Sequence, residues 1–345
     1  MHRAKKNITV KNVARRARVS TGTVSAVLND RPTVAPPTRA RVLRVIQELH
    51  FRPNHIARSL IARETRTIGL VVKQIDNPYF TKVMRSVLIF FNERGYTVLL
   101  GSSELSPQKE HESVETLLRR RVDGLILSPL QGRGTDVSYI SRLTREQFPF
   151  VLLDKVPGVR TNVVDIQNIH AAEEAITYLI RLGHRRISYY EGPDYSLHNT
   201  ERLDGFKQIM VKNNLQLLPS SIRKAGVYIE DGYRAATRQF SESGKKPTAI
   251  FCFNDLVAIG VMNALFDLNI RVPDDVSIIG FDDIEFCSVV KVPLTSIRIP
   301  AVEIGNAAAE LLLRQIENKT KNLREVIRLK APLVLRASCA RVNRK

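Results

Sequence analysis

The stretch TVKNVARRARVSTGTVSAVLN, residues 9–29, decides the fold of the N-terminal part of this chain. The apolar residues of its first half have the spacing of one face of an α-helix: Val10, Val13, Ala14 and Ala17. After a break at Arg18-Val19-Ser20, a second apolar helix face follows: Val24, Val27 and Leu28. Two short helices joined by a tight turn form a helix-turn-helix, whose second helix enters the major groove of DNA.

Residues that favour helix ends support this interpretation. Thr9 and Ser20 are the expected N-caps, because a hydroxyl can accept a hydrogen bond from the backbone amides that a helix start leaves unpaired. A third helix is predicted from Pro36 to about Leu49, since proline suits the first helical turn. Its expected apolar face consists of four residues: Val42, Leu43, Ile46 and Leu49.

Charge is concentrated in the same segment. The 345 residues include 53 Lys and Arg against 34 Asp and Glu, a formal net charge of +19. Residues 1–64 alone hold 14 basic and three acidic residues, a net charge of +11. This distribution favours an N-terminal module that binds a polyanion, next to a body whose basic and acidic residues nearly balance. The alternative is an ordinary helical bundle with a solvated basic face. A hydrophobic content of 43% excludes a mostly disordered chain.

The three cysteines, Cys252, Cys287 and Cys339, are widely spaced and include no CxxC pair, so we expect neither a disulfide framework nor a zinc site. The first residues lack the apolar core of a signal peptide. The longest apolar runs are far shorter than the ~20 residues that span a bilayer. We therefore expect a soluble, cytoplasmic protein.

From residue 66 onward, strand-like and helical patterns alternate in two rounds. The first round predicts strands at 68–72, 97–100, 124–127 and 150–153 and helices at 79–94, 107–121 and 138–146. The second predicts strands at 187–190, 222–227, 249–253 and 276–280, helices at 169–182, 200–213, 231–243 and 255–268, and a final apolar segment at 307–316. Buried strands between helices predict two α/β lobes with parallel sheets and a ligand cleft at the carboxyl ends of the strands.

No catalytic constellation is present in this pattern. Gly132-Arg133-Gly134 follows a strand but lacks the third glycine of a dinucleotide-binding loop. No Walker loop, GxSxG elbow or HExxH motif occurs. The adjacent carboxylates Asp282 and Asp283 and the histidines do not have the spacing of an acid/base pair or of metal ligands. We expect no catalytic residue, no metal and no cofactor, and hence no enzyme.

Nearly the whole chain resembles the LacI/GalR (lac-repressor-like) family of bacterial transcriptional regulators. The matching N-terminal motifs are residues 8–14, 19–20, 23–25, 27–29, 38–42 and 52–60. In the body they are 68–72, 77–80, 121–126, 182–187, 201–206, 247–251, 254–255, 272–283, 293–297 and 335–339. The resemblance implies an all-α helix-turn-helix domain at 1–52, a hinge helix and linker at 53–65, and a two-lobed periplasmic-binding-protein-like domain at 66–345.

The resemblance also implies which residues contact DNA. In and around the helix-turn-helix they are Thr9, Ser20, Thr21, Gly22, Thr23, Ser25, Ala26, Asn29 and Arg39. In the hinge, which would lie in the minor groove, they are Asn54, His55, Ala57, Arg58 and Leu60. Leu60 would wedge between base pairs and kink the DNA, with packing of the hinge as its alternative role. Since Thr21, Gly22 and Ala26 cannot make a bidentate arginine–guanine contact, we expect specificity to depend more on DNA bending.

An effector site is implied between the lobes. Arg202, Asn254 and Asp282 match positions that hydrogen-bond ligand groups, Tyr79 and Phe80 match aromatic contacts, and Asp154 matches a further polar contact. A fixed guanidinium, a carboxylate and an aromatic wall suit a sugar or a sugar derivative. The alternatives are structural: Asn254 as a helix cap, Asp282 as a turn residue, and Arg202 paired with Glu201 or Asp204.

The expected function is that of a repressor controlled by a small effector. Two chains, or four in the alternative assembly, would bind a pseudo-palindromic DNA operator in the bacterial nucleoid. The effector would change the angle between the lobes and thereby the hinge, with a coupling of ~1–3 kcal/mol whose sign the sequence leaves open. The alternatives are a solute-binding protein of a transporter, an enzyme with an added DNA-binding domain, and an architectural protein with an inactive pocket.

Overall fold

The computed structural model describes residues 8–28, 31–51, 64–132, 135–318 and 324–342. The chain divides into two compact units, Met1–Thr65 and Arg66–Lys345. Each unit is described by itself below. Within the described residues, no helix combines the length and the apolar character that crossing a membrane requires.

The first unit is built from three helices, α1 (Val10–Ala17), α2 (Thr21–Leu28) and α3 (Pro36–Glu48). Ser20 caps α2, because its Oγ accepts a hydrogen bond of 3.0 Å from the backbone amide of Thr23. At the start of α1, the backbone amide and the hydroxyl of Thr9 both donate to Oδ1 of Asn12, at 2.8 and 2.7 Å. Arg18 follows α1 in the left-handed conformation, with φ of 54°.

The core of this unit corrects one prediction about α3. The buried residues are Val13, Ala14, Ala17, Val24, Val27, Val42, Val45 and Phe51. Leu43, which was expected on the buried face, is 46% exposed. Counted from Val42, the positions three, four and seven residues later are Val45, Ile46 and Leu49, whereas Leu43 lies about 100° around the helix.

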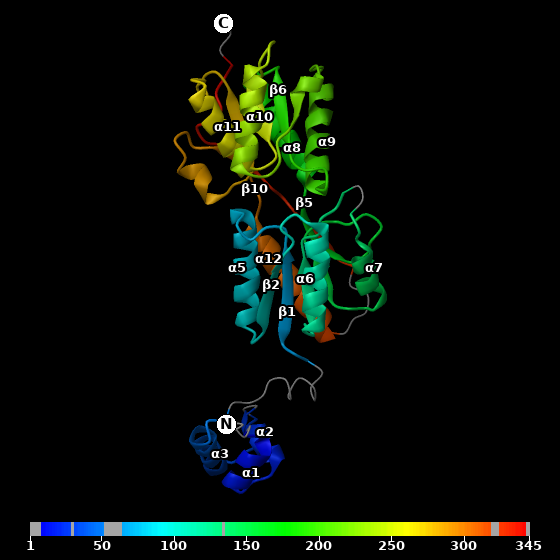
Figure 1. Cartoon of the computed structure of the whole chain (residues 1–345), viewed down its shortest axis with the longest axis vertical. Helices are drawn as coiled ribbons and strands as arrows, with labels where there is room; N and C mark the ends of the chain where they lie inside the picture. The colour runs from blue at the N-terminus through cyan, green and yellow to red at the C-terminus, as the bar shows by residue number, and fades with distance from the viewer. Residues whose placement is uncertain (1–7, 29–30, 52–63, 133–134, 319–323, 343–345) are drawn as a thin grey trace, which may run out of the picture. The chain divides into compact units, whose positions relative to one another are not determined.

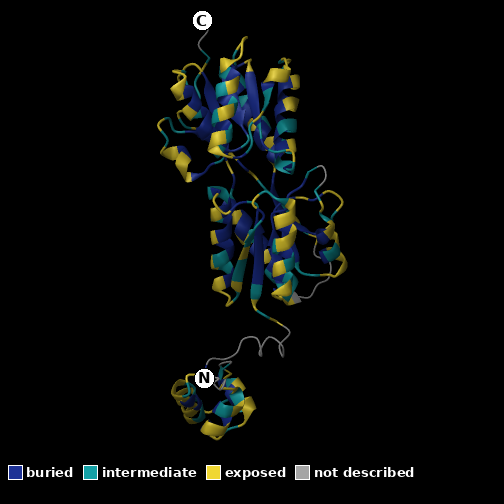
Figure 2. Ribbon diagram, in the orientation of Figure 1, coloured by how far each residue is buried: buried dark blue, intermediate teal, exposed yellow. Residues whose placement is uncertain are grey.

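The first lobe of the second unit has a six-stranded sheet in the order β11-β5-β4-β3-β1-β2, and its pairings are all parallel. Its strands are β1 (Thr67–Val72), β2 (Thr97–Ser102), β3 (Gly124–Leu127), β4 (Phe150–Leu152), β5 (Asn162–Ile166) and β11 (Val326–Leu329). Its helices are α5 (Pro78–Asn92), α6 (Pro107–Arg119), α7 (Ser138–Arg145) and α12 (Ala301–Asn318). The residues of the central strands are buried, as Figure 2 shows, and most are apolar, as expected of a sheet covered on both faces.

The second lobe repeats this plan with the sheet order β12-β10-β9-β8-β6-β7. Its strands are β6 (Ile187–Glu191), β7 (Ile222–Lys224), β8 (Ala249–Cys252), β9 (Ser277–Asp282), β10 (Thr295–Arg298) and β12 (Leu333–Val334). Its helices are α8 (Asn168–Arg181), α9 (Leu197–Lys212), α10 (Ile229–Ser241) and α11 (Asp255–Asp267), with short 3₁₀ turns at Pro219–Ser221 and Glu285–Ser288. The expectation of parallel sheets is confirmed, except that β12 pairs antiparallel with β10.

The chain crosses between the lobes at three places, after β5, after β10 and after β11 (Figure 1). As a result α12 packs on the first sheet although it follows the second lobe in sequence. The carboxyl ends of both sets of parallel strands lead into the loops at this boundary. The fold therefore places loops from both lobes around one interlobe pocket.

Candidate functional site

The exposed face of the helix-turn-helix carries small side chains. Thr21, Gly22 and Ser25 are exposed, and Ala26 is half-buried. Thr23 is half-buried, and its hydroxyl forms a hydrogen bond of 2.9 Å with that of Ser20. A Cβ added at Gly22 would meet only Ser20 Oγ, at 3.5 Å, which is an ordinary contact. The packing of α2 therefore does not require glycine at this position.

The first unit also carries exposed basic side chains on and around α1 and α3. They are Lys11, Arg15, Arg16, Arg18, Arg31, Arg41 and Arg44. Arg39 is half-buried, and its guanidinium donates to the carbonyl oxygen of Arg31, so it also anchors the segment before α3. The remaining expected DNA contacts, Asn29, Asn54, His55, Ala57, Arg58 and Leu60, lie outside the described residues.

Between the two lobes lies a pocket of about 60 Å³. The first lobe contributes Lys73, Gln74, Asn77, Tyr79, Phe80 and Leu105, and the second contributes Pro193, Tyr195, Ser196, His198, Arg202, Val227, Phe253, Asn254, Asp282 and Ile299. Five of the six residues expected to contact an effector therefore line one cavity. The sixth, Asp154, does not line it and lies in an ionic cluster beside it.

Arg202 of α9 is 2% exposed and is held on several sides. Its Nε donates to Asn168 Oδ1 at 3.1 Å, and its Nη1 donates to the carbonyl oxygen of Phe253 at 2.5 Å. The guanidinium carbon also lies 3.5 Å from the ring centroid of Phe281, a cation–π contact. Glu201 accepts from Asn168 Nδ2 at 2.9 Å. Among the described residues, Arg202 forms no ion pair with Glu201 or Asp204, the alternative partners expected for it.

Asp282 ends β9 with φ of 116°, and Asp283 follows with φ of 55°. Two successive non-glycine residues in this region mark a strained turn. Burial raises the pKa of the Asp282 carboxyl well above its ordinary value, and the positive charge of Arg202 opposes this rise. A carboxyl group beside a fixed guanidinium can accept from one ligand hydroxyl while the guanidinium donates to another.

The residues that hold this turn could not be identified from the sequence. Asp255 is fully buried, and it accepts from the Ser296 hydroxyl at 2.5 Å and from the Ile284 amide at 2.9 Å. Asp283 forms ion pairs with Arg298 at 2.6 Å and with Arg336 at 2.7 Å. These partners come from separate elements, so only the fold brings them together. They fix the turn that directs Asp282 to the pocket.

Asn254 takes the structural role that was the alternative for it. Its Oδ1 accepts from the Val257 amide at 2.8 Å and caps α11, and its Nδ2 donates to the Val227 carbonyl at 2.9 Å. The two bonds tie the start of α11 to the loop before α10. Asn254 thus lines the pocket with polar groups that the fold already uses.

Tyr79 and Phe80 stand at the start of α5, where Asn77 Oδ1 accepts from the Tyr79 amide at 3.0 Å. Their ring centroids are 4.8 Å apart and the ring planes are tilted by 58°. Phe80 is buried and belongs to the core of the lobe, whereas Tyr79 is half-buried. Tyr79 is therefore the better placed of the two to offer a ring to a ligand.

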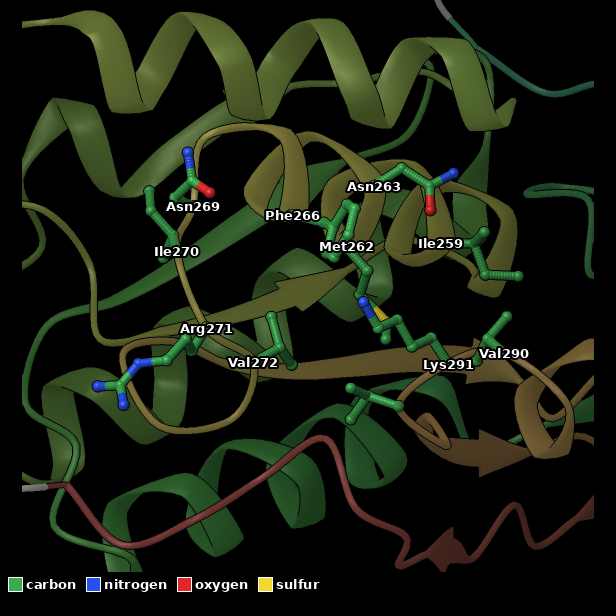
Figure 3. Close-up of a pocket in the computed structure, with 11 residues that line it drawn as sticks. Ile259, Met262, Asn263, Phe266, Asn269, Ile270, Arg271, Val272, Val290 and Lys291 are labelled. Carbon is green, nitrogen blue, oxygen red and sulfur yellow. The ribbon is translucent and has the colours of Figure 1, made fainter.

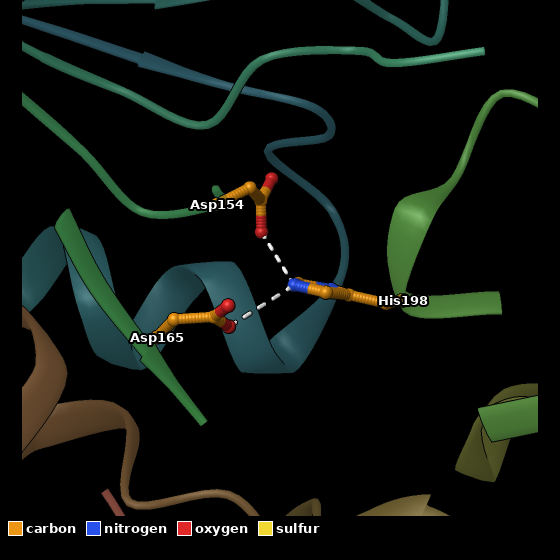
Figure 4. Close-up of side chains that lie close together, drawn as sticks. All are labelled: Asp154, Asp165 and His198. Atoms are coloured by element: carbon orange, nitrogen blue, oxygen red, sulfur yellow. Dashed lines mark ion pairs between the residues drawn. The ribbon is translucent and has the colours of Figure 1, made fainter. Parts of the chain in front are cut away.

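Asp154 lies in a cluster that the sequence did not reveal. Its carboxylate lies 2.5 Å from Lys73 Nζ and 2.6 Å from His198 Nε2, and it accepts from the Ser128 hydroxyl at 3.0 Å. His198 Nε2 is also 3.4 Å from Asp165 Oδ1 (Figure 4). Burial alone would raise the pKa of Asp154, but the attraction of His198 and Lys73 outweighs it and lowers that pKa.

A second, larger pocket of about 710 Å³ lies on the second lobe, between α11 with the segment that follows it and residues 290–292 (Figure 3). Ile259, Met262, Asn263 and Phe266 of α11 line one side, and Val290, Lys291 and Val292 line another. Phe266 is 60% exposed, and Lys291 Nζ lies 3.7 Å from its ring centroid. We call this largely apolar surface the α11 groove.

The chain matches known proteins along most of its length. Residues 9–54 match the bacterial regulatory proteins of the lacI family, and residues 176–339 match the periplasmic binding protein-like domain. The HTH-type transcriptional repressor PurR of Haemophilus influenzae (strain PittEE) is 33% identical over 321 residues, which cover 93% of this chain and 95% of that protein. The chain belongs to the lacI family of bacterial regulatory proteins.

Solved structures agree with this assignment. The lac repressor dimer bound to operator and an anti-inducer has a TM-score of 0.87 at 25% identity, covering 97% of this chain and 100% of that one. A complex of the transcriptional regulator CelR with cellobiose has a TM-score of 0.72 at 28% identity, covering 96% and 99%. As a member of this family, the chain is a DNA-binding transcriptional regulator with a small-molecule effector, and it is not an enzyme.

Proposed function

We propose that this lacI-family regulator is a repressor that acts in the bacterial cytoplasm and whose effector is a sugar or a sugar derivative. The observation that carries the proposal is the interlobe pocket, where Arg202 and Asp282 of one lobe line the same cavity as Tyr79 of the other. Guanidinium, carboxyl and phenol groups together suit a ligand with several hydroxyls and an apolar ring face. Structural relatives hold cellobiose and, in a regulator from Enterococcus faecium, ribose.

On the DNA side, we propose that operator contacts come from the exposed face of the helix-turn-helix and from a hinge at residues 53–65. The first set comprises Thr9, Ser20, Thr21, Gly22, Thr23, Ser25, Ala26, Asn29 and Arg39, and the second comprises Asn54, His55, Ala57, Arg58 and Leu60. The exposed arginines and lysines around α1 and α3 support phosphate contacts. Few long polar side chains project from α2, which supports specificity through DNA bending.

We propose that the operator-bound form is a homodimer and that the α11 groove contributes to its interface. An exposed apolar groove on a soluble domain is typical of an interface. Phe266 is largely exposed in the groove, and Phe286 and Val289 are exposed in the adjoining segment. A two-fold dimer would present two helix-turn-helix units to the two halves of a near-palindromic site.

The proposal is tested in two steps with the full-length protein. An operator is first selected from random double-stranded DNA, and a thermal-shift screen of sugars, nucleosides and phosphates then identifies ligands. A ligand that is the effector should change operator affinity by about 5–150-fold, as measured by fluorescence anisotropy. A protein truncated to residues 65–345 should bind the ligand but not the operator. Specific operator binding by the truncated protein would contradict the proposal, as would a screen in which no sugar binds.

A further inference from the structure

His198 is the side chain through which the second lobe reaches the carboxylates of the first. It belongs to α9, whereas Asp154 follows β4 and Asp165 lies in β5. The imidazole Nε2 lies between the two carboxylates, 2.6 Å from Asp154 Oδ1 and 3.4 Å from Asp165 Oδ1 (Figure 4). The side chains of His198, Asp154 and Asp165 are only 16%, 3% and 7% exposed, so water screens these ion pairs weakly.

The charges around the imidazole favour its protonated form. Lys73, which follows β1, lies 2.5 Å from Asp154 Oδ2 and so neutralises one of the two carboxylates. A proton on His198 neutralises the second. The other charged groups near His198 are Glu201 and Arg202 on the same helix and Asp282 at the end of β9. Four carboxyl groups, one lysine and one arginine therefore lie around a single imidazole.

The lobes are closed in this arrangement. The interlobe pocket of about 60 Å³ is far smaller than the ~300–1,000 Å³ of ordinary ligand pockets, so this arrangement has no room for a sugar. The backbone amide of Gln131 also donates across the boundary to the backbone carbonyl of Tyr195 at 2.9 Å. Lys82 of α5 likewise donates to the carbonyl of Asp283, at 3.4 Å. Entry of a ligand of sugar size therefore requires the lobes to separate and His198 to leave its partners.

We propose that His198 is an ionic latch that holds the two lobes closed while its imidazole is protonated. Loss of the proton leaves Asp154 and Asp165 without a cationic partner from the second lobe and lets the lobes open. The biological role of the latch rests on the proposed function, because an effector that binds between the lobes has to break the contacts of His198 with Asp154 and Asp165. Its test uses the ligand-free protein, so its failure is distinguishable from failure of the effector proposal.

The direction of the pH dependence follows from the pairing. Burial alone would lower the pKa of His198, but the charge of Asp154 and the contacts with both carboxylates raise it to about 9. In the open state the imidazole is solvated and its pKa is the ordinary ~6.5. A group whose pKa is higher in the closed state stabilises that state fully below about pH 6.5 and loses this contribution as the pH rises through about 9.

Titration of the histidines by NMR provides the first test. The full chain has seven histidines, so protein labelled at histidine gives few imidazole signals. The signal that disappears in the His198→Gln variant should titrate more than one pH unit above the ordinary histidine value. A titration of that signal at or below pH 6.5 would overturn the proposal.

Distances between spin labels test the movement of the lobes. The variants Lys109→Cys on α6 and Glu230→Cys on α10 place one exposed label on each lobe. Burial raises the pKa values of Cys252, Cys287 and Cys339, so these thiols form little thiolate and react slowly with the label. Labelled chains diluted into an excess of unlabelled chains report distances within one chain. The short distance between the labels reports closed lobes and the long distance reports open lobes. The ratio of the short-distance to the long-distance population should fall by about tenfold or more between pH 6.5 and pH 10.

Two variants separate the latch from other effects of pH. His198→Gln replaces the imidazole by an uncharged side chain of similar size. This variant should show the long distance between the labels at every pH. His170→Gln, on the exposed surface of α8, should keep the pH response of the unaltered chain. A pH response that persists in His198→Gln would overturn the proposal. Zinc addition at pH 7 would also overturn it if the metal raised the melting temperature of the unaltered chain and not of His198→Gln, because the cluster would then be a metal site.

Discussion

At the scale of single residues, Arg202 and Asp282 differ in what holds them. Arg202 is fixed by Asn168, by the carbonyl of Phe253 and by the ring of Phe281. Within the described part of the chain, no hydrogen bond or ion pair is formed by the Asp282 carboxyl group. Arg202 therefore supports the fold as well as the pocket, while Asp282 is available to a ligand.

This difference predicts distinct effects of two substitutions. Asp282→Asn should weaken effector binding about two- to tenfold, because a typical hydrogen bond contributes ~0.5–1.5 kcal/mol, and should leave the unfolding midpoint unchanged, since asparagine tolerates a positive φ. Arg202→Ala should weaken the effector and also lower the free energy of unfolding by about 3 kcal/mol. Calorimetry with the ligand from the screen and urea unfolding measure the two effects. Unfolding of Asp282→Asn at lower urea than Arg202→Ala would contradict this assignment.

Gly22 provides a second test at this scale. Gly22→Gln should stabilise α2 by about 0.5–1 kcal/mol, since the position is exposed and glycine is a poor helix former. Glutamine can also make a bidentate contact with adenine, so operator selection should gain adenine at one position in each half-site. Gly22→Ala is the control, with a similar gain in stability and no new base preference. An unchanged selected operator would mean that position 22 does not face the bases.

At the scale of elements, the sequence predicted most helices and strands well but missed the last two strands at one side of each sheet. β5, β10, β11 and β12 were not predicted, and α12 was predicted only as an apolar segment at 307–316. β11 is partly exposed at an edge of its sheet, and β12 has two residues, so neither carries a continuous apolar run. β5 contains the buried polar residues Asn162 and Asp165, whose partners lie elsewhere in the chain.

The proposed hinge at residues 53–65 is the segment on which operator specificity should depend most. Leu60→Ala should weaken specific operator binding by about tenfold and non-specific binding little, because an apolar wedge acts only where the DNA is kinked. Anisotropy titrations with operator and with random DNA at one fixed salt concentration measure both. Leu43→Ala, an exposed leucine on α3, is the matched control and should change neither. An equal loss of both kinds of binding would show that Leu60 only packs the hinge.

At the scale of the whole molecule, the α11 groove predicts how the chain assembles. Phe266→Asp should convert the dimer to a monomer and reduce operator affinity by about 100-fold or more, since a buried aromatic residue near the centre of an interface contributes strongly. Light scattering after size exclusion measures the mass. Val211→Asp alters an apolar residue of α9 that is 64% exposed and should leave the dimer intact. A Phe266→Asp protein that remains dimeric would place the interface elsewhere.

The sequence by itself determined the local elements, the basic N-terminal module and the family, because helix periodicity, charge and contiguous motifs are local properties of a chain. Only the tertiary structure decided which groups meet in the cleft. The ion pairs of His198 join residues that are 44 and 33 positions apart, and the network around Asp255 reaches residues about 40 positions away. Such pairs depend on how strands and crossovers place distant residues, so no local pattern predicts them. Asp154 became an ion-pair partner for this reason, whereas the cap that Asn254 forms on α11 is a local contact between residues three positions apart.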